Sequence, residues 1–131
     1  MNDQLKKIIR ESSFKIEDGR YVYAKVSEFP EAGKHFMVTK DDEEITVVTR
    51  EENLGGLMLI ETNKEFYRLI SLDVSVPFYA VGFLAAVSNE IAKEGINILI
   101  VSTYSKDYFL IRDDKIEEVE LILKKLGFKS K

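Results

Sequence analysis

The chain has 131 residues, near the commonest size of a single domain, and 45% of them are hydrophobic, as expected of one soluble domain or two small units with a shared core. Its net charge is −4, and residues 66–131 carry 9 basic and 9 acidic side chains, so the basic excess that nucleic-acid binding needs is missing. Cysteine is absent, which excludes disulfides, thiolate metal sites and a cysteine nucleophile and favours a cytoplasmic protein.

The N-terminal half is predicted to fold as a short helix, two β-hairpins and a loop. Asn2 or Asp3 is the expected N-cap of the helix, and Asp18-Gly19 between two β-prone runs is typical of a hairpin turn. The expected ranges are 3–11 for the helix, 13–17 and 21–26 for the first hairpin, 35–39 and 44–49 for the second, and 53–57 for the loop.

The C-terminal half is predicted to run strand, helix, strand, strand, helix. The last helix has one apolar face, a capping box formed by Asp114 with Glu117, and Gly127 as its stop. One further strand from the N-terminal half would complete a ferredoxin-like βαββαβ sheet with helices on one face, an α+β fold. The expected ranges are 65–76, 79–94, 97–102, 108–112 and 115–126.

The longest apolar stretch predicts no membrane span. It covers residues 76–87 and is interrupted by Pro77 and Gly82. Because a membrane-spanning helix needs about 20 apolar residues, we expect that the protein is not embedded in a membrane.

Two hairpins resemble each other, and two interpretations stay open. Each has an apolar strand that ends in a hydroxyl, Thr39 or Ser102, with an acid five residues further on, Glu44 or Asp107. Either any two hairpins agree this well, or the chain contains a diverged duplication whose first copy has lost most of its helix. We favour the duplication, with a degenerate unit at 1–65 and a complete domain at 66–131.

Side chains suited to catalysis are sparse. His35 is the only histidine, and no triad or histidine-rich metal site can be built from it. The acidic run 41–44 lacks the alternating ligands and the glycine of an EF-hand loop, and Gly55-Gly56 lacks the lysine of a phosphate-binding loop. We therefore expect no catalytic residue, no metal and no cofactor, and an enzyme is the least supported class.

The most informative feature of the sequence is a set of three motifs between Val76 and Ile111. It consists of V-P-F-Y-A-V-G-F-L from Val76, G-I-N-I from Gly95 and S-T-Y-S-K-D-Y-F-L-I from Ser102. In this order and spacing it resembles the ACT domain, as found in small duplicated ACT proteins, cellular arginine sensors and aspartate kinases. The resemblance spans about residues 66–127, and its most specific part is S-T-x-x-x-D-Y followed by three apolar residues.

This resemblance implies a βαββαβ fold that pairs with a second copy and binds an amino acid or a similar effector at the interface between ACT units. Backbone N–H groups at a helix start would receive an effector carboxylate, and Asp107 would accept an ammonium or guanidinium group. The binding residues that the resemblance implies are Phe78, Tyr79, Ala80, Val81, Gly82, Asn97, Ile98, Ser102, Thr103 and Asp107. In the first copy Thr39 and Glu44 would correspond, although Lys40 replaces the second hydroxyl.

The leading hypothesis is a cytoplasmic, regulatory, tandem ACT-like homodimer that binds an amino acid and neither nucleic acid nor membrane. One alternative is a ligand-free dimerisation or protein-interaction module, in which Gly82 and Ser102 serve only packing and turn formation. Another is an RNA-binding ferredoxin-like sheet. Tyr108 and Phe109 supply part of the aromatic surface that RNA binding needs, but the charge balance does not supply a basic one.

Overall fold

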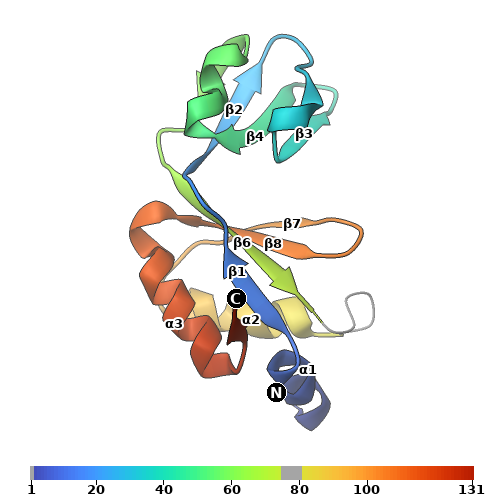
Figure 1. Ribbon diagram of the computed structural model, residues 1–131, viewed down its shortest axis with the longest axis vertical. Helices are drawn as coiled ribbons and strands as arrows, with labels where there is room; N and C mark the ends of the chain where they lie inside the picture. The colour runs from blue at the N-terminus through green and yellow to red at the C-terminus, as the bar shows by residue number, and fades with distance from the viewer. Residues whose placement is uncertain (1, 75–80) are drawn as a thin grey trace. The chain divides into compact units, whose positions relative to one another are not determined.

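A computed structural model describes residues 2–74 and 81–131, which form an α+β protein with ferredoxin-like sheets (Figure 1). Their contacts divide them into two compact units. The large unit comprises the described parts of 1–18 and 68–131, and the small unit comprises 19–67. The division of the chain into repeats at 1–65 and 66–131 stays a prediction, because compact units and repeats need not share boundaries.

The large unit contains a five-stranded sheet in which an N-terminal strand fills the gap left by the C-terminal elements. In the order β9–β1–β6–β8–β7, strand β1 runs antiparallel to β6, with Phe14 opposite Leu72. This confirms that one N-terminal strand completes the βαββαβ sheet. The helices are α1 (Asp3–Arg10), α2 (Phe83–Lys93) and α3 (Ile116–Leu126), and the strands are β1 (Ser13–Ile16), β6 (Tyr67–Asp73), β7 (Leu99–Ser102), β8 (Asp107–Arg112) and β9 (Lys129–Ser130).

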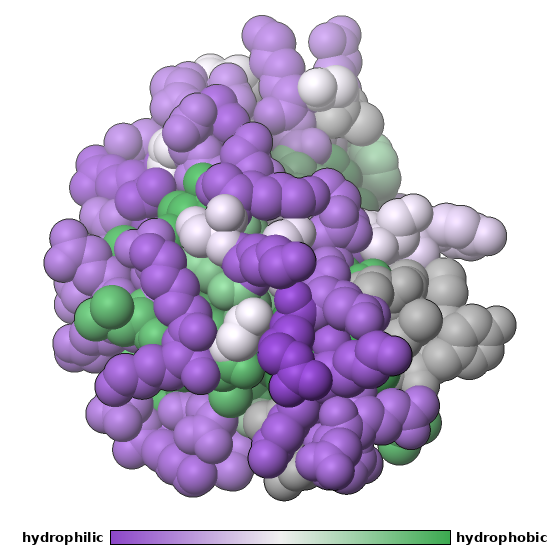
Figure 2. All heavy atoms as spheres, turned by 60° about the horizontal axis from the view of Figure 1, so that its bottom comes forward, coloured by the Kyte–Doolittle hydropathy of each residue, from purple (hydrophilic) through white to green (hydrophobic). Residues whose placement is uncertain are grey.

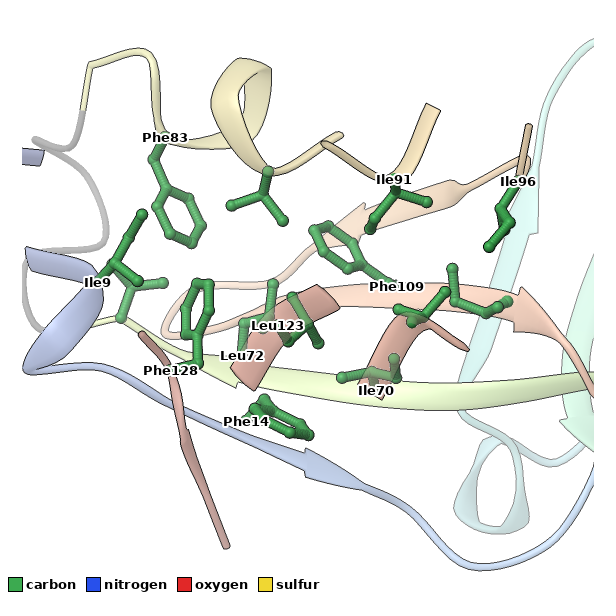
Figure 3. Close-up of a cluster of buried hydrophobic side chains, with 14 of the residues drawn as sticks. Ile9, Phe14, Ile70, Leu72, Phe83, Ile91, Ile96, Phe109, Leu123 and Phe128 are labelled. Atoms are coloured by element: carbon green, nitrogen blue, oxygen red, sulfur yellow. The ribbon is translucent and has the colours of Figure 1, made fainter. Parts of the chain in front are cut away.

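The core of the large unit lies between its helices and one face of its sheet. Alternate residues of the strands point into it, as the two-residue period of a strand requires, so Ile70 and Leu72 of β6 meet Phe109 of β8 there (Figure 3). Phe83 of α2 packs edge-to-face on Phe128, with ring centroids 5.8 Å apart. Figure 2 shows one outer face, which is mostly hydrophilic with small hydrophobic areas. Burial of apolar side chains therefore holds this unit together.

Local signals explain the ends of the helices, with one exception. Asn2 caps α1, because its Oδ1 accepts a hydrogen bond from Leu5 N over 2.7 Å. Gly127, at φ 115°, ends α3 as predicted. The predicted capping box at Asp114 is wrong, because the 3-10 turn η3 (Asp113–Lys115) precedes α3 and Asp114 instead accepts a hydrogen bond from Arg112.

The small unit repeats the ferredoxin-like strand order without its helices. Its four antiparallel strands lie in the order β3–β4–β2–β5, and two short 3-10 turns stand where the fold has helices. Their bounds are β2 (Tyr21–Val26), η1 (Ala32–Lys34), β3 (Met37–Lys40), β4 (Ile45–Arg50), η2 (Glu51–Gly56) and β5 (Leu59–Thr62). The small unit thus has the strand order of the fold in reduced form, and its core contains Ala24, Val26, Val47 and Leu57.

Two predictions about the N-terminal half are wrong. The runs around Asp18-Gly19 are strands but not a hairpin, because β1 pairs with β6 and β9 while β2 pairs with β4 and β5. Phe14, only 1% exposed, draws β1 into the core of the large unit. The expected loop at 53–57 mostly belongs to η2, and β5 after it was not predicted.

Helix α2 begins at Phe83, later than the predicted start at residue 79, and Gly82 at φ 81° immediately precedes it. None of the helices in the described ranges 2–74 and 81–131 has the length and apolar character needed to cross a membrane.

Candidate functional site

Three of the predicted site residues meet at the end of the β7–β8 hairpin. Ser102 and Asp107 are directly opposite each other, and Ser102 Oγ donates a hydrogen bond to Asp107 Oδ1 over 2.6 Å. Thr103 closes the turn, because its backbone N and its Oγ1 both donate to the Lys106 carbonyl, over 2.8 Å and 3.2 Å. The hairpin thus fixes the positions of these hydroxyl and carboxylate groups.

The Ser102–Asp107 pair lies on the side of the sheet that carries the helices. Asp107 is two residues from Phe109, whose side chain lies in the core, and side chains two apart on a strand share a face. Figures 1 and 3 both show the β7–β8 turn at the end of the large unit where β6 finishes and α2 begins. The carboxylate of Asp107 and the start of α2 therefore belong to the same end of the domain.

The start of α2 provides an open helix N-terminus. Gly82 is the N-cap, no side chain of residues 2–74 or 81–131 caps the helix, and the first turn contains no acidic residue. A Cβ at Gly82 would meet nothing within 4 Å, and Val81 beside it is 92% exposed. The partial positive charge of the helix N-terminus is thus not compensated by a side chain of its own first turn. Of the predicted residues here, Phe78, Tyr79 and Ala80 lie outside the described residues.

Asn97 and Ile98 lie at the opposite end of β7 from Ser102. Ile98 packs against the core, and Asn97 is exposed. At roughly 3.3 Å per residue, the four steps along the chain from Ile98 to Ser102 span on the order of 13 Å. Among the described residues, no hydrogen bond joins the Asn97 side chain to Ser102, Thr103 or Asp107.

The small unit does not reproduce the Ser102–Asp107 pair. Its hairpin turn closes with the same backbone hydrogen bond, from Asp41 N to Glu44 O over 3.0 Å. The pair next to the turn is Lys40 opposite Ile45, whereas Thr39 faces Thr46. The two hairpins therefore align one residue away from the predicted alignment. Glu44 instead extends to Lys25, with Oε1 at 3.9 Å from Nζ.

The described residues contain no group of three His, Asp or Glu side chains arranged to hold a metal ion. His35 has its Nδ1 at 2.9 Å from Oγ1 of the buried Thr49. This contact joins His35 to a buried side chain of β4.

The fold of the chain is similar to the folds of several proteins of known structure. A protein of unknown function from Vibrio cholerae is 23% identical, with a TM-score of 0.77 over 95% of this chain and 96% of that one. A proposed C-terminal regulatory domain of aspartate kinase from Porphyromonas gingivalis is 13% identical, with a TM-score of 0.56 over 90% of this chain and 98% of that one. Aspartokinase III of E. coli, solved with aspartate and ADP, is 13% identical, with a TM-score of 0.59 over 88% of this chain and 32% of that one.

No curated protein matches the chain. The family model described as "ACT domain" matches residues 63–125. This range contains β6, α2, β7 and β8 and most of α3, which are the elements that build the candidate site. Over residues 63–125 the sequence thus matches the ACT domain family, and the fold of the chain is similar to that of the solved structures.

Proposed function

We propose that the ACT domain binds an amino acid or a related metabolite as a regulatory effector at the β7–β8 end, and that the chain performs no catalysis. The observation that carries this is the environment of Asp107. Within the described ranges its carboxylate accepts one side-chain hydrogen bond, from Ser102, and forms no ion pair. An acceptor for an ammonium group thus lies at the same end of the domain as a helix N-terminus that no described side chain caps, which would favour a carboxylate.

A zwitterion carries both of the charges that such an end would bind. The aspartate in the E. coli aspartokinase III structure supports an amino acid as the effector class, since that protein shares the fold. We further propose that the protein is cytoplasmic and forms a homodimer, in which a second copy completes the site between ACT units.

Thermal unfolding in the presence of each of the twenty amino acids tests this function. An effector at 100 times its Kd adds about 2.7 kcal/mol to the free energy of unfolding, which raises the Tm by roughly 5 to 10 °C in a chain of this size. If no amino acid raises the Tm while the protein is dimeric, the chain is a dimerisation module instead.

Asp107→Asn locates the site, because it removes the negative charge and keeps the shape. We expect it to abolish the effector-induced rise in Tm without lowering the Tm of the free protein by more than a few degrees. Asp114→Asn is the matched control, since Asp114 is exposed and, among the described residues, pairs only with Arg112. A rise in Tm that persists in Asp107→Asn would place the effector elsewhere.

A further inference from the structure

The small unit has a hollow of about 270 Å³ on one face of its sheet. Tyr23, Ala24 and Lys25 of β2 line it, and Tyr23 and Lys25 alternate along the strand with Ala24 and Val26, whose side chains are buried. Because neighbouring side chains of a strand point to opposite faces, the hollow lies on the face away from the small unit's core. Strands β4 and β5 contribute Thr46, Glu61 and Thr62, and Asn63 follows them.

Charged groups of both signs meet in this hollow. Lys25 is the central residue, with Thr46 opposite it on β4 and Glu61 opposite it on β5. Directly opposed side chains on one face are about 5 Å apart at Cβ. Glu44 joins them from the β3–β4 turn, with its Oε1 at 3.9 Å from Lys25 Nζ. One ammonium and two carboxylates leave a net charge of −1.

A ligand can bind these charged groups at little cost in free energy, because they take part in few interactions that must be broken. In the part of the chain that the structure describes, the Glu61 side chain has no hydrogen bond and no ion pair. The Lys25–Glu44 contact joins two side chains that are 46% and 40% exposed, and such surface ion pairs contribute little to stability. A ligand carboxylate can therefore bind Lys25 without breaking a strong interaction.

One wall of the hollow is held in place by a small network. The rings of Tyr23 and Tyr67 pack edge-to-face, with centroids 5.8 Å apart. Asn63 N donates to the Tyr23 carbonyl over 2.9 Å, and Asn63 Nδ2 donates to Tyr67 Oη over 3.0 Å. This network fixes Asn63 beside Glu61 and Thr62, so the wall is ordered before any ligand arrives.

We propose that this hollow is a second small-molecule site, which takes an α-amino acid with a cationic side chain. Lys25 binds the carboxylate, Glu61 binds the α-ammonium group, and Glu44 attracts the side-chain cation, which offsets the net negative charge of the hollow. The volume suits one molecule of amino-acid size. This site lies wholly within the small unit and does not depend on the β7–β8 site.

Amide chemical-shift titration of the ¹⁵N-labelled full chain tests the proposal with L-lysine, L-norleucine and L-glutamate. L-Norleucine has the length of lysine without its side-chain ammonium. We expect shifts at Thr46, Glu61 and Thr62, tightest binding by L-lysine, about tenfold weaker binding by L-norleucine and the weakest by L-glutamate. The proposal is overturned if none of the three moves these amides, or if L-glutamate binds them most tightly.

Two variants assign the contacts. Lys25→Met and Glu61→Gln each remove one charge and keep the length of the side chain, and each should weaken L-lysine binding about tenfold or more. Glu28→Gln is the control, since Glu28 is exposed in the same unit and does not line the hollow. Circular dichroism confirms that the variants are folded.

The two sites of the protein are separable in the same experiment. Asp107→Asn should leave the lysine-induced shifts at Thr46, Glu61 and Thr62 unchanged. If Asp107→Asn abolishes them while Lys25→Met and Glu61→Gln do not, the hollow is not the site. If only the proposed β7–β8 site is wrong, the rise in Tm that depends on Asp107 will be absent. The lysine-induced amide shifts in the small unit will remain.

Discussion

The Ser102 hydroxyl donates a hydrogen bond to the Asp107 carboxylate over 2.6 Å, across a directly opposed pair of β7 and β8. The acceptor is a carboxylate, so the bond is charge-assisted, and it orients Asp107 at the end of the hairpin. The corresponding pair in the small unit, Lys40 and Ile45, does not repeat this arrangement. Of the two hairpins, only β7–β8 therefore carries this polar pair.

A double-mutant cycle of Ser102→Ala and Asp107→Ala should show a coupling free energy of about 1 kcal/mol in urea unfolding. The value is modest because Ser102 is exposed and water replaces much of the lost hydrogen bond. A coupling energy indistinguishable from zero would show that the hydrogen bond does not form in solution.

Phe14→Ala should lower the free energy of unfolding of the large unit by about 3 to 5 kcal/mol, measured by urea unfolding. The side chain is 1% exposed, and its strand lies far outside the family match at residues 63–125. Lys15→Ala, the adjacent exposed position on β1, should change stability by less than about 0.5 kcal/mol. Equal effects of the two substitutions would contradict the placement of β1 in this sheet.

Asn2→Ala should lower the free energy of unfolding by about 1 kcal/mol, because it removes the cap that accepts a hydrogen bond from Leu5 N. Asp114→Ala removes only a surface contact with Arg112 and should cost less than about 0.5 kcal/mol. Chemical denaturation of both variants checks this. A larger loss for Asp114→Ala would revive the capping box that the structure excludes.

Tyr23 should make the protein less stable at alkaline pH. Burial, and then the neighbouring Tyr67, raise the pKa of Tyr23 above its ordinary value near 10. The folded state therefore holds the proton more tightly, so its stabilising contribution is complete below pH 10 and is lost as the pH rises toward the folded-state pKa. Tyr23→Phe should flatten this decline in urea unfolding series between pH 8 and 11. An identical decline in that variant would show that Tyr23 is not its source.

Local patterns in the sequence predicted most of the elements that build the candidate site. The apolar face and Gly127 predicted α3, and the hairpin that brings Ser102, Thr103 and Asp107 together follows from two β-prone runs around a polar turn. These features need no knowledge of distant residues, because helical and strand periodicity and turn chemistry act within a few positions. The three polar groups were therefore predictable as a cluster.

The hollow of the small unit was not predictable in the same way. Lys25 and Glu61 meet because β2 pairs with β5, and β5 itself was not expected. The one available signal was the polar alternation of Tyr23 and Lys25 along β2, which indicates a face but not what lies across from it.

By itself the sequence determined the match to the ACT domain over residues 63–125 and the polar turn from Ser102 to Asp107. The tertiary structure alone decided which strands pair and in which register. Asp18-Gly19 illustrates the reason: a turn dipeptide constrains a few dihedral angles, whereas burial of Phe14 beside Leu72 removes a large apolar area from water. Long-range burial outweighed the local hairpin signal, and β1 joined the large unit.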